Sequence, residues 1–276
     1  MAMSIRTNVA SLNAQRNLYT TQNALDSSLS KLSSGYRITK AGDDAAGLGI
    51  STKLESQIRS YSQAVRNAND GLSVIQSTES ALNEQANILT RLRELAMQSS
   101  SDGIGNTERG YVQKETSALV SELERIAQVT EYNGTKLLNG TTATMDFQIG
   151  LFSTANDAIS FSGLDMTTSS TGLSITGLSM ATKGSALAAL ASIDVALEKV
   201  SSARANLGAN GNRFQSAINN IQSFAESLSA ANSRIKDVDV AEETSRMSRS
   251  QILMQAGVSV LAQANQAPQL ALKLLG

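Results

Sequence analysis

Few residues in this chain have the types and spacing that catalysis or metal binding requires. The 276 residues include no cysteine and no histidine, so thiolate ligands, imidazole ligands and the commonest general base of enzymes are all absent. Asp43 and Asp44 stand beside Gly42, and paired carboxylates next to glycine can form a cation site. No further acidic residues follow at the spacing of a calcium loop, so we expect one of the pair to cap the next helix instead.

No motif gathers the remaining lysines and carboxylates beside a pocket. We therefore expect no catalytic residue, no bound metal and no cofactor, and an enzyme is the least supported function class.

The composition favours long helices over a globular enzyme core. Hydrophobic residues make up 41% and aromatic residues 4% of the chain, and its single proline leaves little to interrupt a helix. The formal net charge is −1, from 23 basic and 24 acidic residues, so we expect no nucleic-acid partner. No apolar run is long enough to span a bilayer, and we expect no ordinary signal peptide because the first 30 residues lack a basic stretch followed by an apolar run. The chain is expected either to be cytoplasmic or to leave the cell by a route that does not read such a signal.

Heptad-spaced apolar stripes are the elements that organise the chain. The clearest runs over residues 54–89, a second over 190–235 and a shorter third over 112–126. A helix rises ~1.5 Å per residue, so the first stripe is roughly 54 Å long and must lie against other long helices. We predict a mainly α fold: a long antiparallel helical bundle or coiled coil, with paired N- and C-terminal helices and a small β-hairpin insert.

Each end of the chain also carries an amphipathic stripe. In the first segment the stripe includes Leu18, Tyr36 and the residues that we assign to polymerisation, Ile5, Val9, Leu12, Leu25, Leu29 and Leu32. In the last segment it includes Val240 and, assigned to polymerisation, Met247, Met254, Val258, Leu261, Leu272 and Leu275. A lone amphipathic helix cannot bury its stripe, so we expect the two ends to pair and these residues to form intersubunit surface. The stripe at 54–89 is expected to be intramolecular core.

The period of the apolar residues changes to two between the helical halves. Two short runs of alternating apolar and polar residues predict a β-hairpin, with apolar positions Met145, Phe147, Ile149, Ile159 and Phe161. Residues 141–185 hold 17 serines and threonines and only four charged residues. Beyond the hairpin we therefore expect a polar, short-stranded or loosely ordered insert that faces solvent. Its segment at residues 167–182 is expected to be dispensable for assembly. Its hydroxyls are candidates for O-glycosylation or for simple solvation.

A glycine-rich segment, residues 34–50, precedes the first long stripe. Its four glycines predict a non-helical connector.

Several sequence blocks at both ends resemble the bacterial flagellins. They are LSSGYRI at 32–38, DDAAGL at 43–48, RNANDG at 66–71, SRIKDVD at 233–239 and QAGVSVLAQANQ at 255–266. The similarity covers roughly residues 1–140 and 185–276, with the blocks in the same order as in that family. The middle of the chain matches nothing particular, so the chain resembles a short flagellin with a minimal variable region.

This resemblance implies a mechanical function and a set of partners. In flagellins the terminal segments pair as a coiled coil that lines the filament core, and identical subunits stack into a hollow helical propeller for swimming motility. The resemblance implies export by the flagellar type III apparatus, with an export chaperone at the C-terminal segment. The protein is then expected outside the cell, in the flagellar filament, without a cleaved signal peptide. Filament cap and hook-associated proteins are its other expected partners.

The same resemblance divides the chain into five segments. They are the N-terminal filament-core helix and spoke at 1–45, the N-terminal bundle part at 46–140, the hairpin and variable insert at 141–184, the C-terminal bundle part at 185–235 and the C-terminal filament-core helix at 236–276.

A receptor site is implied within the bundle. Residues 90–98 resemble the flagellin segment that animal Toll-like receptors recognise, and by position Arg91, Leu95 and Glu115 match its principal contacts. The alternative is that Arg91 and Glu115 are solvated surface charges while Leu95 packs in a seam.

Two other functions are consistent with long helical stripes. A hook–filament junction protein resembles flagellin at both termini and has the same architecture. A cytoplasmic coiled-coil adaptor, such as a soluble chemoreceptor signalling rod, would share the heptads but has no need of the block at residues 34–48.

The terminal stripes lead to a prediction for the monomer. A lone stripe does not offset the entropy of ordering a helix, roughly 1–2 kcal/mol per residue for the backbone. We expect limited proteolysis of the monomer to cleave before about residue 45 and after about residue 235, and to spare the chain between. A monomer that stays intact at both ends under conditions that digest an unfolded control contradicts this prediction.

Overall fold

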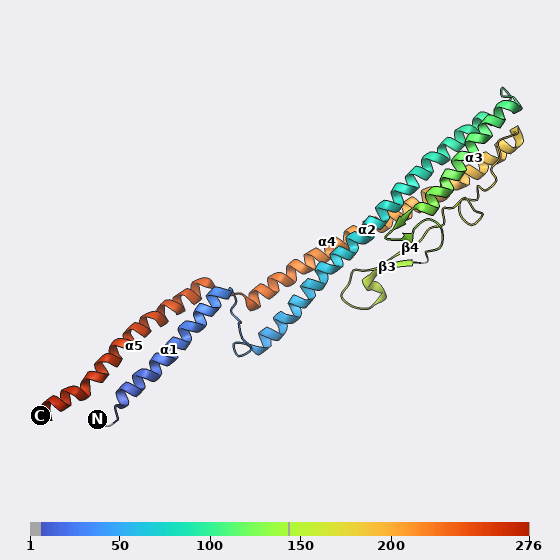
Figure 1. Cartoon of the computed structure of the whole chain (residues 1–276). Helices are drawn as coiled ribbons and strands as arrows, with labels where there is room; N and C mark the ends of the chain where they lie inside the picture. Colours follow the sequence, from blue (N-terminus) through green and yellow to red (C-terminus); the bar gives the residue numbers. More distant parts are fainter. Residues whose placement is uncertain (1–6, 143, 276) are drawn as a thin grey trace. The chain divides into compact units, whose positions relative to one another are not determined.

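The computed structural model describes residues 7–142 and 144–275, with side-chain burial described as far as Gln266 (Figure 1). The helices are α1 Val9–Ser34, α2 Ala45–Ser100, α3 Asn106–Val129, the 3₁₀ turn η1 Ala155–Asp157, α4 Lys183–Lys236 and α5 Val240–Leu275. The strands are β1 Glu131–Tyr132, β2 Thr135–Lys136, β3 Thr144–Gln148 and β4 Ala158–Ser162. Residues 1–58 with 226–276 form one compact unit, and residues 59–225 form a second.

The core of the second unit is built from the stripes that the sequence predicts for α2, α3 and α4. Buried residues at heptad spacing are Ala68, Ile75, Leu82 and Leu89 of α2, Val112 and Ile126 of α3, and Ile193, Val200, Leu207 and Phe214 of α4. They belong to one continuous hydrophobic cluster. Burying each large apolar side chain contributes ~1.5–3 kcal/mol, so this cluster is the main source of the unit's stability. The predicted mainly α architecture with a small hairpin is confirmed.

The predicted hairpin packs onto this core. Strands β3 and β4 are antiparallel, and Met145 stands opposite Phe161. Phe161 is fully buried, and the ring of Phe147 meets that of Phe214 edge-on with centroids 5.7 Å apart. Gly71 of α2 makes room for this aromatic pair, because a Cβ there would lie 2.6 Å from Cζ of Phe214.

A second, smaller hairpin follows α3. Strands β1 and β2 pair Tyr132 with Thr135, so only Asn133 and Gly134 form the turn. Both turn residues have positive φ, 49° and 79°, which is the type I′ geometry that an Asn-Gly pair favours. The sequence predicts the turn here but not the two-residue strands beside it.

Residues 165–180, which we call the strap, contribute to the core instead of facing solvent. Leu173, Ile175 and Met180 of the strap are each at most 1% exposed. The expectation of a loosely ordered, solvent-facing insert is therefore wrong for these residues. Because three apolar side chains scattered in an irregular segment show no period, sequence patterning does not reveal their burial.

Polar side chains of the helices hold the strap backbone. The backbone N–H and the hydroxyl of Thr168 both donate to Oε2 of Glu124, at 2.8 Å each. Gln85 donates to the carbonyl of Met166 at 3.2 Å, and Ser99 donates to the carbonyl of Met180 at 2.6 Å. These bonds satisfy backbone groups that have no sheet or helix partner, which allows an irregular segment to be buried.

The glycine-rich connector is shorter than the sequence predicts. Helix α1 ends at Gly35, whose φ is 76° and whose N–H donates to the carbonyl of Lys31. Helix α2 begins at Ala45 because Oδ1 of Asp44 accepts the N–H of Gly47 at 2.8 Å, as predicted for a capping carboxylate. Gly47 and Gly49 are therefore helical. Among the residues described, no helix has a stretch long and apolar enough to cross a membrane.

The bond between Glu124 and the strap leads to a prediction on stability against pH. Burial raises the pKa of Glu124, but hydrogen bonds from Gln128 and Thr168 outweigh it, so its pKa lies below the ordinary 4.5. Because the pKa of Glu124 is lower in the folded chain than in the unfolded chain, its ionised carboxylate stabilises the fold above pH 4.5. This stabilisation is lost as the pH falls through the folded-state pKa. We expect Glu124→Gln to lower the free energy of unfolding at neutral pH by about 1.5 kcal/mol and to flatten its decline in acid.

Glu122→Gln is the matched control on the same helix. Glu122 pairs with Arg125 at the surface, where water and salt screen the pair and leave it little effect on stability. Urea unfolding of both variants and the parent chain at neutral pH and below pH 4.5 provides the measurement. Equal losses for the two variants at neutral pH are inconsistent with an anchoring role for Glu124.

Candidate interaction surfaces

Helices α1 and α5 pair through a narrow heptad seam (Figure 1). The seam residues are buried or half-buried at alternating spacings of three and four: Ser11, Ala14, Leu18, Thr21, Leu25, Ser28 and Leu32 of α1, and Glu243, Met247, Ser250, Met254, Gly257, Leu261 and Ala264 of α5. At Gly257 the two helices come so close that a Cβ would lie 3.0 Å from Cδ1 of Leu18. The predicted pairing of the two ends is therefore present within one chain.

Polar contacts fix both ends of this seam. Near the chain termini, the side chain of Asn8 donates to the carbonyl of Ala264 at 2.8 Å. Toward the connector, the buried hydroxyl of Ser28 donates to Oε1 of the buried Glu243 at 2.5 Å. Many of the seam residues are small or polar, so the seam buries little apolar area for its length.

The outer faces of the pair carry large apolar side chains in contact with solvent. They are Val9, Leu12, Tyr19 and Leu29 of α1, and Val240, Ile252, Leu253, Val258 and Val260 of α5, each 48–73% exposed. Exposed apolar side chains that gather in this way are typical of association surfaces.

The predicted polymerisation residues divide between seam and outer face. Leu25, Leu32, Met247, Met254 and Leu261 lie in the seam, where they bind the partner helix of the same chain. Val9, Leu12, Leu29 and Val258 lie on the outer face and are available to other chains. Ile5 lies outside the described residues, and Leu272 and Leu275 belong to α5 without a described side-chain environment.

Sequence reasoning missed Tyr19, Ile252, Leu253 and Val260 on the outer face. The signal is present, because Leu253 and Val260 stand seven residues apart, each directly before a member of the Met254 and Leu261 stripe. When two neighbouring positions of each heptad are both apolar, the apolar surface is wider than one partner helix covers, which indicates a second contact surface on the helix.

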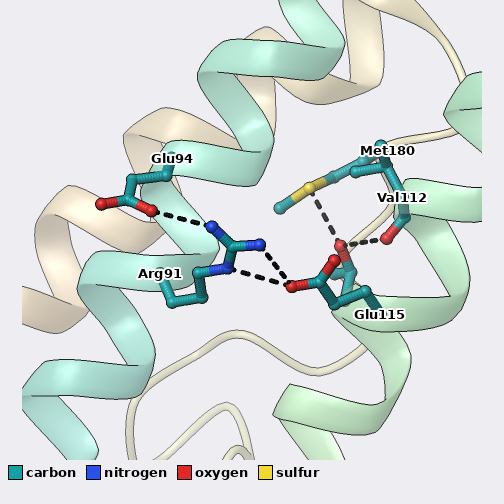
Figure 2. Close-up of polar contacts among 6 residues, drawn as sticks. Arg91, Glu94, Val112, Glu115 and Met180 are labelled. Carbon is teal, nitrogen blue, oxygen red and sulfur yellow. Dashed lines mark hydrogen bonds and ion pairs between the residues drawn. The ribbon is translucent and has the colours of Figure 1, made fainter.

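The predicted receptor residues lie on α2 and α3 of the second unit. Figure 2 shows Arg91 between Glu94 of its own helix and Glu115 of α3, with Nη2 of Arg91 2.8 Å from Oε1 of Glu115. The hydrogen bonds that Arg91 donates to Glu115, and then the one to Glu94, raise the pKa of Arg91 further above its ordinary value. Leu95 is 2% exposed and packs in the core. The structure thus brings Arg91 and Glu115 together at the surface and places Leu95 beneath them.

The paired aspartates of the connector act within the fold. Oδ2 of Asp43 accepts the N–H groups of Thr39 and Lys40, both at 3.0 Å, while Asp44 caps α2. The backbone bonds from Thr39 and Lys40 lower the pKa of Asp43. Throughout the described part of the chain, no three potential metal-ligating side chains gather in one place.

The fold and surfaces define a helical structural protein with an apolar face suited to association. Family models give its class more closely: residues 5–143 match the bacterial flagellin N-terminal helical region, and residues 190–275 match the bacterial flagellin C-terminal helical region. The chain belongs to the bacterial flagellin family. It is therefore a structural subunit of the flagellar filament, which serves motility, and not an enzyme.

Similar sequences cover the whole chain. A flagellin of Halalkalibacterium halodurans is 42% identical over 99% of this chain and all of its own length. Polar flagellin A of Vibrio parahaemolyticus is 35% identical and is aligned over the full length of both chains. These relatives do not favour the hook–filament junction alternative.

Solved structures share the architecture. The crystal structure of Bacillus cereus flagellin covers 60% of this chain and 94% of its own, with 27% identity and a TM-score of 0.51. A putative flagellar hook-associated protein from Vibrio parahaemolyticus covers 71% of this chain and all of its own, with a TM-score of 0.60. At 12% identity that second likeness shows the fold alone.

Proposed function

We propose that this filament subunit polymerises through the outer apolar faces of α1 and α5. The observation that carries the proposal is that Val9, Leu12 and Val258 remain more than half exposed after the two helices have paired. Burying each of them fully against a neighbouring copy contributes ~1.5–3 kcal/mol, and the gain repeats along the filament. Leu29, 48% exposed, belongs to the same proposed surface.

The seam residues have a different part in this proposal. Leu25, Leu32, Met247, Met254 and Leu261 hold α1 against α5, and so align the two outer faces for neighbouring subunits. Segments 1–45 and 236–276 then form the filament core, segments 46–140 and 185–235 the bundle, and 141–184 the variable insert.

We infer the remaining partners from the family and from the same outer face. The flagellar type III export apparatus delivers the subunit outside the cell without a cleaved signal peptide. Before assembly, the apolar outer face of α5 requires cover, and an export chaperone at the C-terminal segment supplies it. Filament cap and hook-associated proteins meet the two ends of the polymer.

We also propose that Arg91 and Glu115 form part of a surface that an animal Toll-like receptor binds. Both side chains are about half exposed, and a paired guanidinium and carboxylate offer donors and acceptors in fixed directions. Leu95 is buried in the core, so it holds α2 in place through packing and is not itself exposed to a receptor.

A substitution on the outer face tests polymerisation. Val258→Asp places a charge where the proposal buries a valine, so we expect filament formation to be lost while the helix content of the monomer is unchanged. Val258→Thr, of similar shape, should only raise the protein concentration needed for assembly. Leu261→Asp should disrupt the seam and with it both pairing and assembly. Sedimentation and electron microscopy under polymerising conditions provide the measurement, and Val258→Asp filaments of normal length refute the proposed surface.

Receptor binding is tested by titrating a receptor ectodomain against monomer, filament and an Arg91→Ala monomer. We expect the parent monomer to bind most tightly, because a neighbouring subunit covers this face in the filament and Arg91→Ala removes the guanidinium. Arg93→Ala is the control, since Arg93 forms a similar surface pair with Asp194 at 2.7 Å. Equal affinity for every form, or an equal loss for both arginine variants, rules out this site.

A further inference from the structure

Three Asn-Gly pairs occur in three different backbone environments. They are Asn133-Gly134 in the β1–β2 turn, Asn139-Gly140 after β2, and Asn210-Gly211 within α4. An Asn-Gly pair is chemically reactive, because glycine has no side chain to shield its backbone nitrogen from the neighbouring carboxamide. Whether it reacts depends on whether the fold leaves that nitrogen and the carboxamide free.

The turn between β1 and β2 leaves both groups free. Asn133 and Gly134 are exposed, and nothing lies within 4 Å of the point where a Cβ of Gly134 would stand. Among the described residues, no hydrogen bond of the Gly134 N–H or the Asn133 side chain is found. The hairpin pairs two residues on each strand, with one further backbone bond from the N–H of Leu137 to the carbonyl of Thr130, and so short a ladder has low local stability.

The other two pairs are restrained. The N–H of Gly140 donates to the carbonyl of Leu164 at 3.1 Å, and Oδ1 of Asn139 accepts the N–H and the hydroxyl of Thr141. Asn210 and Gly211 lie far inside the 54-residue helix α4, where each backbone N–H is held by the preceding turn.

We propose that Asn133 is a site of spontaneous deamidation. The backbone nitrogen of Gly134 attacks Cγ of Asn133 and a C–N bond forms. The bond from Cγ to Nδ2 breaks, and the NH2 group leaves as ammonia with the proton from the backbone nitrogen. Water then adds to one of the two carbonyls of the resulting succinimide and opens the ring, giving aspartate or isoaspartate. One water is consumed, one ammonia is released, and no oxidant or reductant takes part.

The product changes the charge and the geometry of the turn. The formal net charge goes from −1 to −2, since one neutral side chain becomes a carboxylate. The new charge lies in a cleft that Asn133 shares with Asp70, so the two carboxylates repel each other. Isoaspartate also adds a methylene to the backbone, which the two-residue turn cannot accommodate without loss of the β1–β2 pairing.

Tryptic peptide mapping of the aged full-length monomer tests the proposal. The three pairs fall on separate peptides, residues 126–136, 137–183 and 205–213, so each conversion is followed by mass and by fragmentation. We expect Asn133 to deamidate about tenfold faster than Asn139 in the folded protein, which corresponds to ~1.4 kcal/mol of barrier. Asn210 should be the slowest of the three. In denaturant the three rates should converge, because the restraints disappear.

The outcome is decided by the order of rates. Faster conversion of Asn133 only in the folded protein, with convergence in denaturant, supports the proposal. Equal rates for Asn133 and Asn139 in the folded chain overturn it, as does an Asn133 that stays amidated while Asn139 converts.

Discussion

Two helices in contact can each bury only one stripe. This limit governs the first unit, because α1 and α5 have apolar side chains on more than one face and, among the residues described, pack mainly against each other. Leu25 and Met254 lie in the seam between the two helices, whereas Leu12 and Val258 stay exposed on the outer faces. In the second unit α3, the β3–β4 hairpin and the strap also pack on α2 and α4. These two helices therefore bury apolar side chains on more than one face there.

The sequence predicts the elements whose apolar residues keep a regular period. Ile75, Leu82 and Leu89 recur every seven residues and all are buried on α2, and the alternation around Phe161 locates the large hairpin. In each case the buried residues lie on one face of a regular helix or strand, so the spacing of the apolar residues alone identifies that face.

Features that depend on single polar contacts could not be predicted in this way. Nothing in the spacing of Glu124 and Thr168 indicates that they meet, yet this bond anchors a segment whose composition is typical of a solvated loop. The start of α2 depends likewise on one capping bond at Asp44, which makes two glycines helical. At the candidate surface, the pattern identifies Leu261 and Val258 as apolar but cannot say which faces α1, since that depends on the crossing of the two helices.

The buried bond between Ser28 and Glu243 fixes the longitudinal alignment of α1 and α5. A slip of one helical turn, ~5.4 Å, would remove this donor and leave the Glu243 carboxylate in the seam with only the 3.9 Å ion pair to Arg246 of its own helix. Apolar contacts alone would tolerate such a slip, because neighbouring heptad layers resemble one another. The hydroxyl therefore sets the axial register of the two helices. That register determines which apolar side chains of α1 and α5 lie at the same level along the pair.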